Sequence, residues 1–265
     1  MIRRQPEKLP FANADHKQEL TMFLLHQTAV YLHITGGVVA LLLFWIPVFA
    51  RKGSPVHKRI GRYFALLMYM IGISGLLMSS MDLWIPEVLH PDNNPANTRN
   101  TAIFLFSLSL LVLTTTRHGW LTINYRDNRL PLRKPFQLAL VGALLLCGIG
   151  LFALGLMRSN MIFVAFGGLE VALSAGILRY TFKQQTRPRE WWTEHLGGLI
   201  ASGIGAYTAF FVFGAVTIME PLFNQLPWLP VLVWVGPGVI GGIAITVVSR
   251  HYRRKFSPKP ATVSN

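Results

Sequence analysis

Two long uncharged segments of the chain are joined by the sequence Arg51-Lys52-Gly53-Ser54-Pro55-Val56-His57-Lys58-Arg59-Ile60-Gly61-Arg62. This stretch carries five Lys or Arg side chains in twelve residues. It also contains a helix start, because Ser54 can cap a backbone N–H and Pro55 has no N–H to leave unpaired in the first turn. Moving several cations across hydrocarbon is disfavoured, so we expect this turn to stay in the cytoplasm and to orient the other helices.

The composition points in the same direction. The 265 residues are 52% apolar and 14% charged, with a net charge of +14. The charges lie in short loops between uncharged runs, so the basic excess indicates membrane topology and contact with anionic lipid headgroups, and not a nucleic-acid partner. The single cysteine, Cys147, excludes an internal disulfide and a cysteine-rich metal site.

The uncharged runs predict an all-α membrane protein of seven transmembrane helices. Each run covers the roughly 20 residues that a spanning helix needs. The expected spans are about 22–50, 60–83, 100–118, 135–157, 160–179, 195–219 and 230–249. They form a transmembrane domain of residues 20–250, between a polar N-terminal arm at 1–19 and a basic tail at 251–265.

The distribution of cations predicts the orientation. With seven spans, the loops on one side of the membrane and the C-terminal tail carry 19 of the 25 Lys and Arg residues, and the other side carries 6. Because basic loops are retained in the cytoplasm, this asymmetry predicts an external N-terminus and a cytoplasmic C-terminus.

Polar residues within the spans are candidates for a functional site. His33 and Glu170 both fall near the middle of the bilayer at about 1.5 Å per residue, and Tyr207 falls in the outer-to-middle layer. A carboxylate at a helix centre costs about 3 kcal/mol on insertion scales, so Glu170 should face the bundle and either be protonated or have a partner, for which His33 is the candidate. Alternatively, a neutral Glu170 bonds to a Ser, Thr or backbone carbonyl and locks helices together.

Two sequence patterns within the spans affect the shape of the bundle around such a site. The sequence Gly236-Pro237-Gly238 would interrupt hydrogen bonding in the last span, either as a proline kink or as a broken helix that lines a site. Small residues repeat every four positions at Gly168, Ala172 and Gly176, and this spacing predicts a ridge for helix packing.

Three histidines, His57, His118 and His195, fall at one depth near the cytoplasmic ends of their spans. Three imidazoles at one depth could bind haem b or a transition metal. The pattern is not specific, and solvated interfacial histidines are the alternative. His26 lies two helical turns before His33 and could share its face. The remaining histidines, which lie in polar segments, are expected on the surface: His16, His90 and His251.

One region resembles a known family. His33…Gly37 followed by Pro55-Val56-His57-Lys58-Arg59-Ile60-Gly61-Arg62-Tyr63 is similar to an uncharacterised family of bacterial multi-pass membrane proteins. That family shows a histidine in the first span and a His-Arg-x-x-Gly-Arg-x-Tyr start of the second. This chain has Lys58 in place of the arginine, and Tyr63 follows directly on the preceding arginine.

A second pattern supports the resemblance. Trp191-Trp192-x-x-His195-Leu196-Gly197, with Thr208-Ala209-Phe210, is similar to a recurring pattern of such proteins. The resemblance implies a helical protein of the bacterial cytoplasmic (inner) membrane. It implies no particular activity, so it assigns no catalytic residue.

Three functions remain open from the sequence. The first is a haem- or metal-binding redox protein, with His57, His118 and His195 as ligands and membrane quinone as a partner. The second is a proton-coupled small-molecule carrier that uses Glu170, His33 and the interruption in the last span. The third is a scaffold or accessory subunit without catalysis, in a homo-oligomer or a larger membrane complex.

Overall fold

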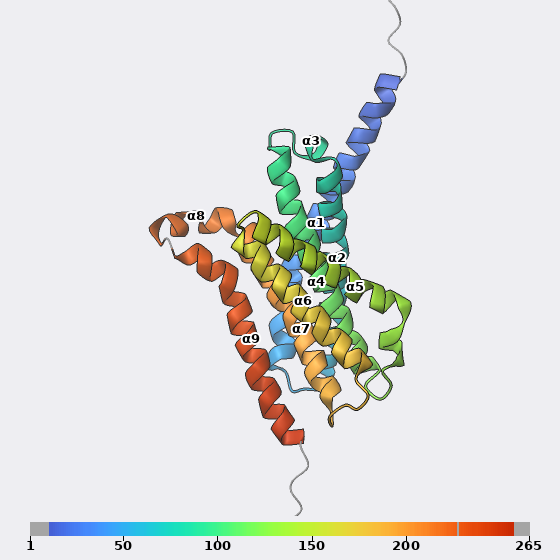
Figure 1. Ribbon diagram of the computed structural model, residues 1–265. Coiled ribbons are helices and arrows are strands. Elements are labelled where there is room, and N and C mark those ends of the chain that lie inside the picture. Colours follow the sequence, from blue (N-terminus) through green and yellow to red (C-terminus); the bar gives the residue numbers. More distant parts are fainter. Residues whose placement is uncertain (1–10, 227, 257–265) are drawn as a thin grey trace, which may run out of the picture.

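A computed structural model of the protein describes residues 11–226 and 228–256, apart from the side chains of residues 11–15, 217 and 256. Within these residues the chain forms helices and no strand. Seven helices are long and apolar enough to cross a membrane: α1 (Phe11–Phe49), α2 (Pro55–Trp84), α4 (Pro95–Asn124), α5 (Pro135–Met157), α6 (Met161–Phe182), α7 (Glu190–Ala209) with its π-helical continuation η2 (Phe210–Gly214), and α9 (Leu229–Phe256). Shorter elements are α3 (Pro86–Leu89), the 3-10 turn η1 (Leu130–Arg133) and α8 (Val216–Gln225). The prediction of an all-α chain with seven such helices is confirmed (Figure 1).

The helix starts follow the local sequence signals. The Ser54 hydroxyl accepts from the His57 backbone N–H at 3.2 Å, and Pro55 is the first residue of α2, as expected. Asn94 caps α4 and Asn160 caps α6 in the same way. These caps satisfy backbone donors that have no partner within the helix.

Several helices are longer than the uncharged runs. α1 begins at Phe11, so residues 11–19 of the expected polar arm are helical, and residues 1–10 lie outside the described part. α9 runs to Phe256 and takes in the start of the basic tail, whose remainder from 257 also lies outside. Hydropathy marks the part of a helix within hydrocarbon, whereas backbone hydrogen bonding continues into the polar layer. At about 1.5 Å per residue, α1 is roughly twice as long as hydrocarbon is thick.

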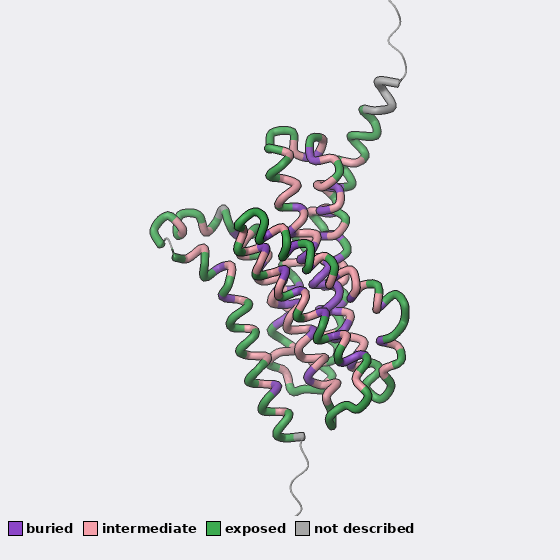
Figure 2. Tube along the Cα trace, viewed as in Figure 1, coloured by how far each residue is buried: buried purple, intermediate pink, exposed green. Residues whose placement is uncertain are grey.

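The bundle is built around α4, which packs against α2, α5, α6 and α7, while α1 lies on α2 and α9 lies on α7 (Figure 1). α4 has the lowest mean hydropathy of the seven helices, yet 72% of its spanning window is buried, against 17% for α9. Figure 2 shows the buried positions gathered in the middle of the bundle, with α9 mostly exposed. In lipid the apolar helices can face outward, so the most polar helix takes the centre.

Consecutive spans alternate in direction, which sorts the loops into two sets. The loops at 51–54, 125–134 and 183–189 and the end of α9 lie at one end of the bundle, here named the basic end. α3 and the turn at 158–160 lie at the opposite end. The starting residue of α1 and the last residue of α9 therefore lie at opposite ends of the molecule (Figure 1).

The seam between α5 and α6 depends on glycine. A Cβ added to Gly167 would lie 2.4 Å from the Phe152 backbone nitrogen, so only glycine fits. The predicted ridge through Gly168, Ala172 and Gly176 is wrong, because Ala172 is exposed and a Cβ on Gly176 would meet nothing within 4 Å. The buried face of α6 contains Gly167, one residue before the predicted Gly168. Glu170 lies on the same face as Gly167 and therefore points into the bundle.

The last span is not interrupted. α9 is one helix from Leu229 to Phe256 with Pro237 inside it. A Cβ added to Gly236 would meet only Leu232 of the same helix, and one on Gly238 would meet nothing within 4 Å. Of the two alternatives, the broken helix that lines a site is therefore not formed, and α9 lies at the edge of the bundle against α7.

Candidate functional site

A carboxylate is enclosed where α4, α5 and α6 meet. Glu170 is 1% exposed, and the Ser107 hydroxyl donates to its Oε2 at 2.5 Å. Its Oε1 has no hydrogen-bond partner. On the α5 side Gly148 lies directly against Glu170, since a Cβ added to this glycine would lie 2.8 Å from the Glu170 Cβ. A protonated Oε1 would lack an acceptor and an ionised one would lack a donor, so the site is chemically incomplete in either state.

The expected pairing of Glu170 with His33 is wrong. His33 Nδ1 lies 2.9 Å from the Ser74 hydroxyl, which itself donates to the Met70 carbonyl at 2.8 Å. Because that hydroxyl proton is used, Ser74 accepts from the Nδ1–H of His33. His33 therefore joins α1 to α2, while Glu170 joins α6 to α4. Equal depth in the membrane did not reveal that the two residues face different neighbours.

Tyr207 joins the first and sixth spans. Its hydroxyl donates to the Leu41 carbonyl at 2.8 Å and accepts from the Trp45 indole N–H at 2.6 Å. It lies one turn before η2, the π-helical segment that ends this span. π-Helical segments are frequent at functional sites. In this protein the hydrogen bonds of Tyr207 hold α7 against α1.

The three histidines at the basic end do not converge on one ion. His57 Nδ1 donates to the Pro47 carbonyl at 3.1 Å, and His195 Nδ1 donates to the Gly119 carbonyl at 2.8 Å. His118 Nε2 lies 3.1 Å from a carboxylate oxygen of Glu194. Within the described residues, these three do not form a group whose ligand atoms lie within 4.8 Å of one another. The three rings therefore do not come together around one metal ion, because each is bonded to a residue of a different helix.

A line of buried polar side chains leads from Glu170 to the basic end. Ser107 meets Glu170, and eleven residues later on α4 His118 packs edge-on against Tyr180 of α6, with ring centroids 5.8 Å apart. The two helices thus run parallel and in register. The polar side chains buried along this interface and at the start of α5, here named the buried polar track, are Ser107, Thr114 and His118 of α4, Gln137 of α5, and Glu170 and Ser174 of α6.

Most residues of the buried polar track have at least one buried polar atom without a hydrogen-bond partner. Unpaired buried atoms occur on Thr114, Gln137, His118 and Ser174, in addition to Glu170. Buried polar groups are normally satisfied by protein or by ordered water, so each of these groups has capacity for a further hydrogen bond. Together, these five residues carry most of the unpaired buried polar atoms of the described residues.

The buried polar track reaches the protein surface at the basic end. His118 is 2% exposed, whereas the side chain of its partner Glu194 is 27% exposed. Cations surround this end: Lys183 pairs with Glu190 at 2.8 Å, and Arg129 donates to the Tyr180 carbonyl at 2.7 Å. Nearby, Lys52 Nζ donates to the last carbonyls of α1, and burial lowers the pKa of this ammonium.

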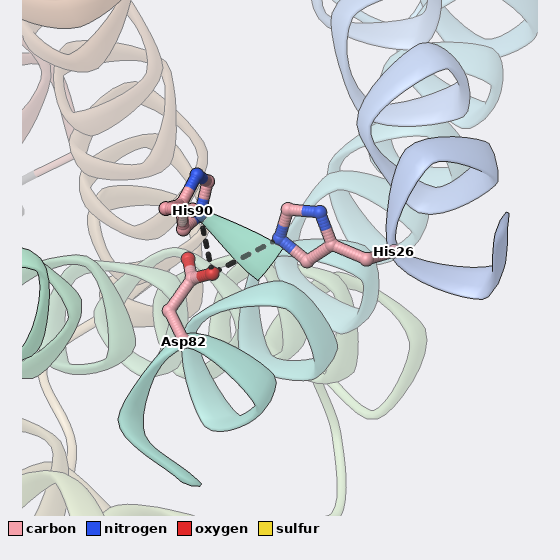
Figure 3. Close-up of side chains that lie close together, drawn as sticks. All are labelled: His26, Asp82 and His90. Carbon is pink, nitrogen blue, oxygen red and sulfur yellow. Dashed lines mark hydrogen bonds and ion pairs between the residues drawn. The ribbon is translucent and has the colours of Figure 1, made fainter. Parts of the chain in front are cut away.

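A second polar group lies at the opposite end of the bundle. His26 of α1, Asp82 of α2 and His90 after α3 meet there (Figure 3). Both imidazoles approach the same carboxylate oxygen, at 3.1 and 2.9 Å. The sequence-based expectation that His90 is a plain surface residue is wrong. No local spacing could have found this group, because its members come from three separate elements.

Over the described residues the fold is all-helical, and its seven long helices are apolar enough for a multi-pass membrane protein. Comparisons with known proteins do not narrow this class further, since no protein-family model, curated protein or solved structure matches the chain. The resemblance carried by residues 33–63 therefore remains a prediction.

Proposed function

We propose that this protein is a proton-coupled carrier of the membrane, with Glu170 as its proton-binding group. The observation that carries the proposal is a fully buried carboxylate with one oxygen paired to Ser107 and the other unpaired. Ionisable residues are costly within a bilayer, and those that face a bundle interior commonly serve as proton relays or ion pathways. A merely structural carboxyl group would be expected to have both oxygens satisfied.

The buried polar track supplies the route for the proton. The track runs from Glu170 to His118, which packs against Tyr180, ten residues after Glu170 on α6. This is about 15 Å, half of the roughly 30 Å of hydrocarbon. Water bound to its unpaired groups would connect Glu170 to His118 and Glu194. In the orientation that the cations favour, the basic end is cytoplasmic and close to anionic headgroups, so the proton is exchanged with the cytoplasm.

Proton coupling has stronger support than the redox alternative. The three histidines expected to hold a haem or a metal are each turned to a separate partner. The scaffold alternative accounts for the Ser107 bond to Glu170 as a lock between α4 and α6. It does not account for the unpaired oxygen or for the unpaired groups that follow it along the seam.

Infrared difference spectroscopy tests the proposal without knowledge of the cargo. We expect the wild-type protein to show a protonated carboxyl band that titrates and shifts in D₂O, and that is lost in Glu170→Gln. Glu220→Gln is the matched control, because Glu220 is an exposed carboxylate of α8. Thr114→Val and Ser174→Ala should slow the deuterium exchange of this band. A Glu170 carboxyl that neither titrates nor exchanges would show a structural lock.

Proton flux provides a second, functional measurement. The protein would be reconstituted into vesicles that contain a pH-sensitive dye, and a potassium diffusion potential would drive protons inward. We expect Glu170→Gln to reduce the flux at least about tenfold, because the relay loses its ionisable group, while Glu220→Gln retains it. Equal flux through wild type and Glu170→Gln would overturn the proposal.

A further inference from the structure

We infer that His26, Asp82 and His90 form a binding site for a divalent transition metal, here named the outer triad. The three residues come from three elements: His26 from the buried side of α1, Asp82 from the last turn of α2, and His90 from the C-terminal cap of α3 (Figure 3). Each offers one ligand atom, and the three atoms lie within 4.8 Å of one another. It is the one such group in the described part of the chain.

The distances fit coordination. Two ligand atoms bound to one Zn²⁺ at about 2.0–2.1 Å with tetrahedral angles lie about 3.3 Å apart. The ring nitrogens of His26 and His90 lie 3.1 and 2.9 Å from the same Asp82 oxygen. The imidazole rings are edge-on to each other, with centroids 5.5 Å apart, so their nitrogens approach the carboxylate from different directions. Small side-chain rotations place all three atoms around one ion.

His26 supplies an independent argument. Its side chain is 4% exposed, and neither ring nitrogen forms a hydrogen bond. The 3.1 Å contact of its Nε2 with Asp82 is of ion-pair length but lacks hydrogen-bond direction. A buried imidazole without a directed hydrogen bond is costly, and coordination of a metal through Nε2 reduces that cost. By contrast, His90 Nε2 forms a hydrogen bond with Asp82 at 2.9 Å, and this nitrogen must be unprotonated to bind a metal.

The surrounding backbone holds the triad in place. Pro86 starts α3 directly after α2, and the backbone N–H of His90 closes this short helix on the Pro86 carbonyl at 2.8 Å. Arg99 of α4 donates to the Leu83 carbonyl and pairs with Glu87 at 2.8 Å, which ties α3 to the bundle. The pKa of the exposed Glu87 is lowered, mainly by a hydrogen bond within its own residue and also by Arg99.

The ligand types select the class of metal. Two neutral imidazoles and one carboxylate suit Zn²⁺ and neighbouring first-row dications such as Co²⁺, and not Ca²⁺ or Mg²⁺, which prefer oxygen ligands. Three protein ligands leave at least one coordination position for water or another ligand. The His90 side chain is 30% exposed, so the ion can enter from the aqueous side at the end opposite the basic loops.

Metal binding to the intact chain tests this inference. The protein would be purified in detergent without a polyhistidine tag, stripped with a chelator, and titrated with Zn²⁺ by calorimetry. We expect one Zn²⁺ per chain, and a loss of affinity of at least about 100-fold in both Asp82→Asn and His90→Ala. Co²⁺ should give visible absorption bands of a nitrogen and oxygen site, and the same variants should lose these bands.

Two controls make the result specific. His16→Ala removes an exposed histidine at the same end of the molecule and should bind Zn²⁺ as the wild type does. Glu170→Gln should also bind normally, so a failure of the proton-coupling proposal would leave this test intact. A wild type without a one-to-one site, or a monodisperse Asp82→Asn that binds as tightly as wild type, would overturn the inference.

Discussion

Replacing Gly167 by alanine should separate α5 from α6 and destabilise the seam that positions Glu170. The added Cβ would lie 2.4 Å from the Phe152 nitrogen, 2.7 Å from the Gly148 carbonyl oxygen and 2.8 Å from the Phe152 Cα. All three are backbone atoms, so no change of side-chain rotamer relieves the overlap. The overlap can be relieved only if α5 and α6 move apart.

The expected loss of stability in Gly167→Ala follows from these distances. Ordinary contact for a Cβ begins at 3.4 Å, so the two backbones must separate by about 1 Å at this point. Overpacking of this kind typically costs about 1–3 kcal/mol. Alanine also recovers the helix-propensity penalty of glycine, about 1 kcal/mol, which partly offsets the loss.

Gly168→Ala is the matched control, because it makes the same chemical change one residue further along α6. There the Cβ would lie 3.8 Å from the Phe152 ring, which is an ordinary contact. Both variants recover the same propensity penalty, so the difference between them isolates packing. We expect Gly167→Ala to be less stable than Gly168→Ala by about 1–3 kcal/mol in the free energy of unfolding.

Unfolding in mixed detergent micelles, followed by tryptophan fluorescence and far-UV circular dichroism, measures this difference. Gly167→Ala should also shift the infrared carboxyl band of Glu170, since the separation of the helices alters its surroundings. Equal stability of the two variants, or lower stability of Gly168→Ala, would refute the inward orientation of the Gly167 face. The assignment of Glu170 to the bundle interior would fall with it, because both lie on the same face of α6.

Three further predictions concern single hydrogen bonds and the orientation. Ser107→Ala should destabilise the protein by about 1–3 kcal/mol, since it leaves both oxygens of the buried Glu170 unpaired, and chemical unfolding measures this loss. Tyr207→Phe should lower the free energy of unfolding by about 1–2 kcal/mol in the same assay. It removes the hydrogen bond to the Leu41 carbonyl of α1 and leaves the Trp45 indole N–H without its acceptor. In a variant without the native cysteine, Asp92→Cys should react with a membrane-impermeant maleimide added to cells, whereas Asn128→Cys should react only after permeabilisation. Labelling of both from outside would contradict the orientation.

The sequence alone predicted the features that depend on short segments. Seven helices able to span a membrane follow from uncharged runs, because each residue contributes to the transfer energy nearly independently of its neighbours. The cap at Ser54 was also predictable, since a cap involves only the first turn of its own helix. The inward position of Glu170 followed from the cost of a carboxylate in lipid, although its partner did not.

Only the tertiary structure decided which faces meet. One residue along a helix rotates the side chain by about 100°, so the choice between the ridges of Gly167 and Gly168 depends on the neighbouring helix and not on local sequence. The partners of His33 and Glu170 were decided in the same way, despite their equal depth. The outer triad joins residues 26, 82 and 90. Their convergence depends on how α1, α2 and α3 pack in three dimensions, for which segment-level hydropathy and charge carry no information.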